Sequence, residues 1–207
     1  NFTHVSGDRL GLNLFVSDLL LSTKSDPAKN GKGATEIYIF YKRSFSLSAL
    51  TGADLSNSIV KDWYINGRID YAHKNTVLKP SPKKLRLGIS TDLAVPVGYV
   101  NIGVDLYKER NHNAITGKNF DFKTTYAAYA VWNIPVSSRG SIEGMIDHIG
   151  AMGDDGFGIN TKPQTLATLN YIHDIGEEGG FKLGVGLQYW RNKYNNDNRR
   201  DSHNGST

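Results

Sequence analysis

Charged side chains of both signs recur in this chain at spacings that place them on shared faces of β-strands. Successive side chains of a strand point to opposite faces, so residues separated by an even number of positions lie on the same face. The charges placed in this way are Lys42, Arg68, Asp70, Lys84, Arg86, Asp92, Asp105, Glu109 and Asp147. They could form ion pairs that hold a sheet together, or line a polar channel that handles sugar hydroxyls. The two roles are compatible.

Aromatic side chains fall on the same faces as these charges. They are Tyr38, Phe40, Tyr64, Tyr107, Tyr129 and Trp190. Nucleobases stack on aromatic rings, at about 1–3 kcal/mol per base, although such rings also pack against a plug or neighbouring side chains. A face that combines rings with charges suits a solute that has a flat base and a polyhydroxyl sugar. The candidate substrate-binding residues are therefore Tyr38, Phe40, Lys42, Tyr64, Arg68, Asp70, Arg86, Asp92, Asp105, Tyr107, Asp147 and Trp190.

Metal and cofactor chemistry finds little support in the sequence. The six histidines include no pair at metal-ligand spacing, and there is no cysteine to supply a thiolate ligand. The acidic pair Asp154 and Asp155 could hold a divalent cation, or it could belong to a plain surface loop. Its surroundings, GDDGFG, lack the ordered ligand spacing of an EF-hand. We expect no metal and no cofactor.

The elements that must position these residues are alternating strands, best seen from Tyr99 to Tyr107. Apolar residues there alternate without a break with polar residues and glycine. The residues expected on the apolar face of this strand and the preceding one are Leu85, Leu87, Ile89, Val100, Ile102, Val104 and Leu106. Repetition of this pattern along the chain predicts an all-β, antiparallel up-and-down transmembrane β-barrel, with lipid outside and water inside. In a soluble β-barrel or sandwich, the alternative, the apolar face would point inward.

Nine strands are expected along the chain. They cover approximately residues 10–21, 35–47, 59–73, 84–93, 99–109, 120–134, 141–149, 165–174 and 181–194, and residues 1–7 are a strand end or a loop. Residues 50–58 are expected to form a turn, and the loops are residues 22–33, 74–83, 110–119 and 150–162. Trp63 and Tyr71, like Phe181 and Tyr189, are eight residues apart. That spacing spans roughly 20 Å along the membrane normal and fits two aromatic girdles.

Length and composition favour one domain over residues 1–207. No run of 18 apolar residues could form a transmembrane helix, and the negative mean hydropathy of −0.41 fits alternating strands. The net charge of +4 is dispersed along the chain, which argues against a nucleic-acid partner. Residues 195–207 are polar and turn-like, and single-chain bacterial barrels have an even number of strands. We therefore expect the barrel to be truncated at both ends.

Several stretches resemble the Tsx/OmpK family of nucleoside-specific outer-membrane channels. They are KDWY at 61–64, LGISTD at 87–92, VNIGVDLYKER at 100–110, WNIP at 132–135 and LQYWRNKY at 187–194, and their order and spacing match across about residues 8–195. The resemblance implies a twelve-stranded barrel in the bacterial outer membrane, whose third strand would be the first one here. It also implies passive diffusion of nucleosides or deoxynucleosides. The strand with Phe40 and Lys42 departs from the acidic or small polar residues expected there.

Two other functions stay open. A general small-solute porin would share the same barrel, because constriction by loops cannot be read from the sequence. An outer-membrane lipid hydrolase would use His148, which faces lipid in this register, with Ser141 or Ser137 nearby in sequence. No nucleophile-elbow motif accompanies them, so we expect a protein that is not an enzyme. The expected partners are nucleosides and outer-membrane lipid, with no nucleic acid, and a monomeric state.

Overall fold

The computed structural model describes residues 1–23, 33–76, 79–113, 117–155, 158–176 and 180–193. Almost all of its regular structure is strand. The strands are β1 (Phe2–Asp8), β2 (Gly11–Leu21), β3 (Thr35–Ser46), β4 (Val60–Lys74), β5 (Lys83–Leu93), β6 (Tyr99–Asn113), β7 (Lys118–Asp121), β8 (Thr125–Pro135), β9 (Gly140–Ile149), β10 (Gln164–Ile175) and β11 (Phe181–Arg191). A short helix, α1 (Leu47–Thr51), follows β3. None of the helices in the described residues is long and apolar enough to cross a membrane.

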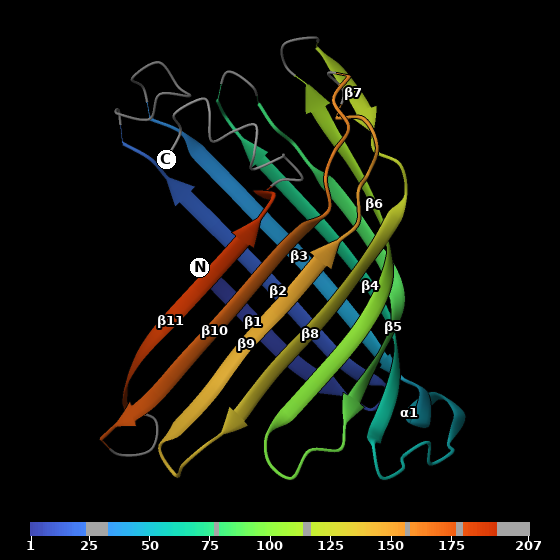
Figure 1. The fold of residues 1–207 in the computed structure, drawn as a ribbon, viewed down its shortest axis with the longest axis vertical. Coiled ribbons are helices and arrows are strands. Elements are labelled where there is room, and N and C mark those ends of the chain that lie inside the picture. The colour runs from blue at the N-terminus through green and yellow to red at the C-terminus, as the bar shows by residue number, and fades with distance from the viewer. Residues whose placement is uncertain (24–32, 77–78, 114–116, 156–157, 177–179, 194–207) are drawn as a thin grey trace.

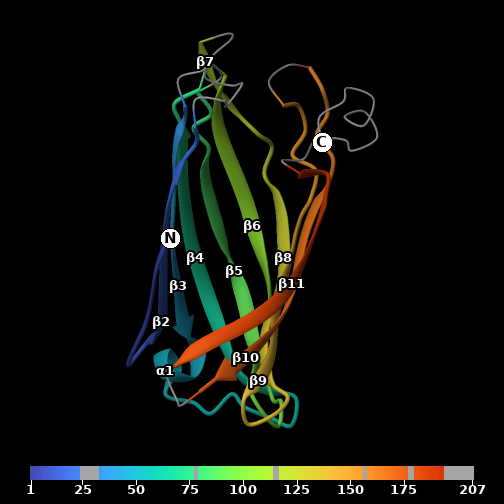
Figure 2. The same ribbon diagram turned by 90° about the vertical axis from the view of Figure 1, so that its left-hand side faces the viewer.

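The strands form one 11-stranded antiparallel sheet in which neighbours in sequence are neighbours in space. Among the described strands, the departure from this order is that β6 pairs with both β7 and β8. The sheet is steeply tilted and curls around a concave face (Figures 1 and 2). In the described residues β1 and β11 stand at the two ends of the strand order. The predicted all-β, up-and-down antiparallel architecture is confirmed as a curled sheet consistent with a β-barrel.

The loops fall into two groups at opposite ends of the sheet. We call the end at which β2 and β4 end and β3 and β5 begin the loop end, and the end that carries α1 and the tighter connections the turn end (Figure 2). Long loops are typical of the extracellular end of such barrels, and short turns of the periplasmic end.

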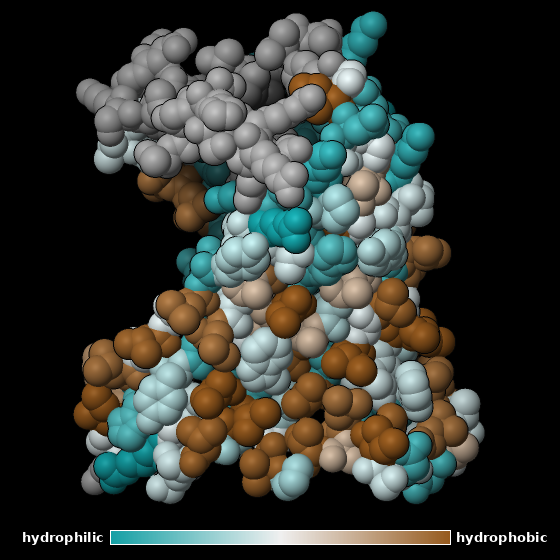
Figure 3. Space-filling view, in the orientation of Figure 1, coloured by the Kyte–Doolittle hydropathy of each residue, from teal (hydrophilic) through white to brown (hydrophobic). Residues whose placement is uncertain are grey.

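The burial of the two faces follows the pattern of a membrane wall. Large apolar side chains on the convex side are exposed, for example Leu87 at 52% and Val104 at 47%, whereas Arg86 and Asp105 on the concave side are each 5% exposed. The registers of β4, β5 and β6 place the predicted apolar residues together on the convex side. In Figure 3 apolar side chains gather over the lower part of the visible wall and polar side chains lie toward the loop end.

Aromatic side chains occur near both ends of the convex side. Tyr71, Tyr126 and Tyr189 lie toward the loop ends of β4, β8 and β11. Trp63 and Phe181 lie near the turn ends of β4 and β11. This is the placement expected for the two girdles that anchor a barrel at the membrane interfaces.

Several predicted boundaries were wrong. Strand β6 continues to Asn113 and pairs with β7 where a loop over residues 110–119 was expected. Residues 2–8 form strand β1, which pairs with β2, so the strand is the alternative that holds for residues 1–7. The single strand predicted over 120–134 is divided, because Phe122 turns into a buried cluster with Tyr107, Ala127, Ile149 and Met152. The turn expected after β3 contains α1, whose N-cap Ser46 accepts a hydrogen bond from the Ala49 amide. Residues 194–207, on which the expectation of a missing strand partly rests, lie outside the described residues.

The turn-end half of the β1–β3 wall has the opposite polarity to the rest of the sheet. Leu14 pairs with Lys42 and so lies on the concave side with it. The convex side carries Asn13, which accepts a hydrogen bond from the Tyr41 hydroxyl at 2.6 Å, and an ion pair at 2.7 Å between Arg43 and Asp8. Alternation alone therefore does not reveal which face of a strand points outward.

Candidate solute pathway on the concave face

The first cluster on the concave face joins β3 and β4. Arg68 Nε and Nη2 donate to the two carboxylate oxygens of Asp70 at 2.8 and 2.7 Å. The Tyr38 hydroxyl donates to Asp70 at 2.5 Å and accepts from Arg68 at 3.0 Å. The guanidinium carbon of Arg68 lies 4.0 Å from the centroid of the Phe40 ring. The neighbouring strands β3 and β4 thus hold two aromatic rings beside an ion pair.

A second cluster crosses the concave face from β3 to β8. Lys42 Nζ lies 3.1 Å from the Tyr129 hydroxyl and 4.6 Å from the centroid of its ring, although β4, β5 and β6 lie between these strands in the sheet. Asn66 Nδ2 donates to the Ser90 hydroxyl at 2.9 Å and to Tyr129 at 3.3 Å. The Tyr129 ring lies against Gly103, where an added Cβ would come within 2.5 Å of it. A glycine is therefore needed for this ring to reach the centre of the concave face.

A third cluster joins β5 to β9. Arg86 makes a bidentate ion pair with Asp147, with N–O distances of 2.7 and 2.9 Å, across two intervening strands. Its guanidinium carbon also lies 5.2 Å from the centroid of the Tyr107 ring. Asp105 Oδ1 and Arg86 Nε are buried without a hydrogen-bond partner among the described residues. Each of these atoms is a buried polar group at the middle of the concave face, with hydrogen-bonding capacity that the described residues do not use.

Tyr107 closes the loop end of the concave face. It is 1% exposed and packs with Phe122, Ala127, Ile149 and Met152, while its hydroxyl donates to Glu109 at 2.5 Å. Lys84 extends this polar edge, with its ammonium 3.9 Å from Glu109. The Tyr107 ring is therefore buried in the packing at the loop end of the concave face.

Tyr64 and Asp92 lie toward the turn end of the concave face. The Tyr64 hydroxyl donates to Asp92 at 2.8 Å, and Asn101 Nδ2 donates to the other carboxylate oxygen at 2.7 Å. Trp190 also lies on the concave side, but on β11, and the Lys193 ammonium stands 4.5 Å from its ring centroid. The predicted residues of β3, β4, β5, β6 and β9 therefore lie on one concave face in the clusters described above, and Trp190 lies on the same face at the β11 end of the sheet.

The chain matches, over residues 15–207, the family described as nucleoside-specific channel-forming protein, Tsx. It belongs to this family. A relative, outer membrane protein OmpK of Vibrio parahaemolyticus, is 25% identical over 190 residues, which cover 91% of this chain and 67% of the relative. The protein is thus a channel-forming outer-membrane protein, as its resemblance to the Tsx/OmpK family implied.

The Tsx family is a family of channels, not of enzymes, and the surroundings of His148 fit that classification. His148 Nδ1 lies 2.8 Å from the Thr165 hydroxyl, and its Nε2 lies 3.4 Å from the Tyr126 hydroxyl. Ser141 lies on the other face of β9, and Ser137 in the turn at the far end of that strand. The geometry therefore assembles no serine and histidine pair from these residues.

The acidic pair after β9 makes local contacts within its own loop. The Asp155 carboxylate accepts a hydrogen bond from the Ile159 amide at 3.2 Å, and Asp154 forms an isolated bridge with Asn160. Within the part of the chain that the structure describes, no three histidine or acidic residues are close enough to hold a metal ion.

Sequence reasoning missed the amide and hydroxyl groups that connect the charges. Asn66, Ser90 and Asn101 are uncharged residues of ordinary types, so the residue types alone do not indicate a functional site. Their positions do indicate one. Asn66 and Ser90 each lie two residues from a predicted residue on the same face, Tyr64 and Asp92, and Asn101 lies opposite Asp92 on the neighbouring strand.

Proposed function

We propose that this protein allows passive diffusion of nucleosides, including deoxynucleosides, across the outer membrane, without a cofactor or an energy source. The description of the Tsx family supports a nucleoside channel. The concave face supports the same function independently, because it holds aromatic rings beside fixed charges of both signs. We also propose that the protein works as a monomer surrounded by outer-membrane lipid.

The observation that carries the proposal is the β3–β4 cluster. Phe40 and Tyr38 lie with ring centroids 6.0 Å apart, beside the Arg68–Asp70 pair. A base that stacks on such a ring is held without regard to its identity, at roughly 1–3 kcal/mol. The adjacent carboxylate and guanidinium can exchange hydrogen bonds with sugar hydroxyls. Both contacts are weak enough to release the solute, which conduction requires.

Contacts that cross the concave face favour a selective channel over a wide porin. The Lys42–Tyr129 and Arg86–Asp147 contacts each join strands that are separated in the sheet. Side chains therefore occupy the middle of the concave face, and a solute must pass close to rings and charges. A general small-solute porin would not need such contacts.

The test is to compare a nucleoside with a sugar of similar size in vesicle swelling and in bilayer conductance. We expect adenosine or thymidine to permeate faster and to block the ion current transiently. Equal permeation with an unchanged current would make the protein a general porin.

Two tyrosines of β4 provide a matched pair of variants. Tyr64 faces the concave side and Tyr71 the convex side. Tyr64→Ala should shorten the nucleoside block, while Tyr71→Ala should leave it unchanged because its ring faces lipid. Equal effects of the two variants would contradict the proposed pathway.

A further inference from the structure

The convex side contains a hollow of about 500 Å³ that crosses several strands. Small side chains of β8, Ala128 and Ala130, form its middle, and the larger Val104 and Ile146 form its sides. It is lined at one end by Trp63 of β4 and at the other by His148 of β9. Apart from His148, the side chains that face outward here present apolar surface; the Thr91 hydroxyl is directed to the Asp62 carbonyl at 2.8 Å.

The strand registers show how this hollow runs. Thr91 pairs with Ile102, Ile102 with Ala130 and Ala130 with Ile146, so the lining follows a row at right angles to the strands. From β4 to β9 this row makes four steps between strands, or about 19 Å at about 4.8 Å per step. With strands tilted by about 40°, the row rises by about 12 Å toward the loop end. One leaflet contributes about 15 Å of hydrocarbon, so the hollow has the reach of an acyl chain.

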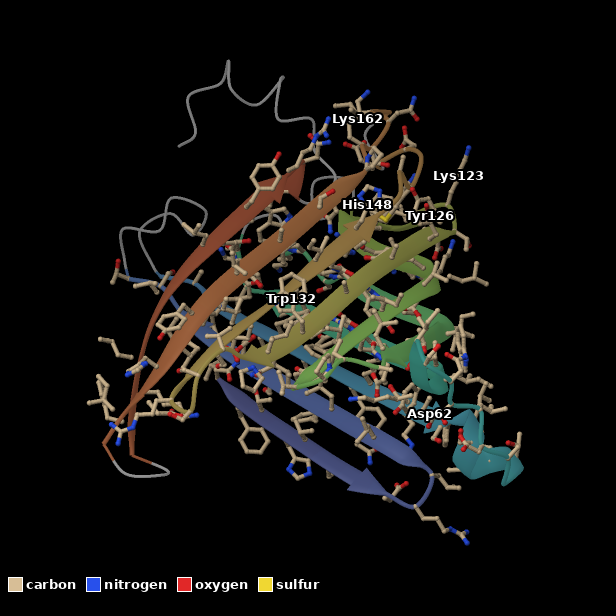
Figure 4. All side chains as sticks on the ribbon, turned by 60° about the horizontal axis from the view of Figure 1, so that its bottom comes forward. Asp62, Lys123, Tyr126, Trp132, His148 and Lys162 are labelled. Carbon is tan, nitrogen blue, oxygen red and sulfur yellow. The ribbon has the colours of Figure 1, made fainter. Side chains whose placement is uncertain are left out.

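The loop end of the hollow is polar. His148 is held between Thr165 and Tyr126 by the contacts given above, and Tyr126 is half exposed on the wall. Figure 4 shows Lys123 and Lys162 at the loop end beyond His148 and Tyr126.

Lys123 is fixed close to this end of the hollow. Its backbone amide donates to the Met152 carbonyl at 2.9 Å, and its aliphatic stem lies over Gly153, where an added Cβ would come within 2.9 Å of Cδ. The side chain is exposed and its backbone is three residues from Tyr126. Lys162, also exposed, is three residues from Thr165 on the other side of His148.

We propose that this hollow binds one anionic lipid of the leaflet at the loop end, with a headgroup of net negative charge whose phosphate lies at Lys123 and Lys162, and an acyl chain running down toward Trp63. The distribution of polarity along the hollow matches that of such a lipid, with cations and hydrogen-bonding groups at one end and apolar surface along the rest. A phosphate group attracts lysines at the membrane surface by about 1 kcal/mol each, which corresponds to a preference of about fivefold for each lysine.

Quenching of Trp63 fluorescence tests the proposal. Trp132→Phe and Trp190→Phe leave Trp63 as the only tryptophan. This variant is placed in phosphatidylcholine vesicles that contain a minor fraction of a lipid with brominated chain ends, which is either phosphatidic acid or phosphatidylcholine. We expect brominated phosphatidic acid to quench Trp63 at a concentration about 25-fold lower than brominated phosphatidylcholine, because each of the two lysines contributes a preference of about fivefold. Equal quenching by both lipids would overturn the proposal. Absence of quenching, because a second copy of the chain covers the hollow, would overturn it as well.

Two pairs of variants separate the chain-binding part from the headgroup site. Ala130→Phe fills the hollow and should abolish the preference, whereas Val185→Phe, on the exposed face of β11, should preserve it. Lys123→Gln should weaken the preference about fivefold, and Lys61→Gln at the turn end should not change it. Resistance of each variant to heat in detergent confirms that it is folded. Unchanged preference in folded Ala130→Phe would show that the lipid does not occupy the hollow.

Discussion

The walls β4–β6 and β1–β3 belong to one sheet but distribute polarity differently. In β4–β6 leucine, isoleucine and valine face outward and charges face the concave side. In β1–β3, near the turn end, Arg43 and Asp8 pair on the convex side and Leu14 faces inward beside Lys42. Both β2 and β6 alternate in sequence, although Phe15 and the leucines at 19–21 interrupt the pattern in β2. The comparison teaches that alternation defines two faces, and that pairing with a neighbouring strand decides which of them meets lipid.

The largest effect is expected where a charge is left without its partner on the concave face. In Arg86→Leu the Asp147 carboxylate, whose side chain is 15% exposed, loses its bidentate partner. Breaking a buried pair in this way costs about 3–5 kcal/mol. Chemical unfolding in vesicles measures this loss. The double variant with Asp147→Leu should recover most of the stability, and a double variant as unstable as Arg86→Leu would contradict an electrostatic origin.

A charge placed on the outer face of β6 should have the next largest effect. Val104→Arg puts a guanidinium near the middle of the membrane wall and should destabilise the protein by about 2–4 kcal/mol. Gln188→Arg, on the concave side of β11, is the control and should change stability little. Gly103 would be a poor control, because any side chain there meets the Tyr129 ring. Equal losses at positions 104 and 188 would show that the two faces are not distinguished by lipid.

A smaller effect should sharpen the comparison between the two walls. Leu14→Gln introduces an amide on the concave side of β2, beside Lys42, and should cost about 1 kcal/mol or less because that face is polar. Leu87→Gln introduces the same group on the lipid side of β5 and should cost more. Unfolding midpoints of the two variants give the order directly. The reverse order would mean that Leu14 faces lipid and that β2 pairs in another register.

The facing of β4, β5 and β6 could be predicted because the charged residues in the middle of each strand share one side and the large apolar residues share the other. Trp63 and Tyr71 could be assigned to two girdles for the same reason. The contact between Lys42 and Tyr129 could not be predicted, because it depends on how tightly the sheet curls and not on either strand alone. The same holds for Arg86 and Asp147. The break after β7 was also hidden, since Phe122 fits a strand pattern and leaves it only to join tertiary packing around Tyr107.

The contacts that span the concave face also bear on the order in which the sheet assembles. Neighbouring strands are joined by hairpins, so their pairing needs only local loop closure. Arg86 and Asp147, by contrast, are 61 residues apart in the chain, and Lys42 and Tyr129 are 87 residues apart. Neither pair can meet until every strand between them has been added and the sheet has bent. These polar contacts are therefore late events in folding, made when the wall is already in place and its curvature is being fixed.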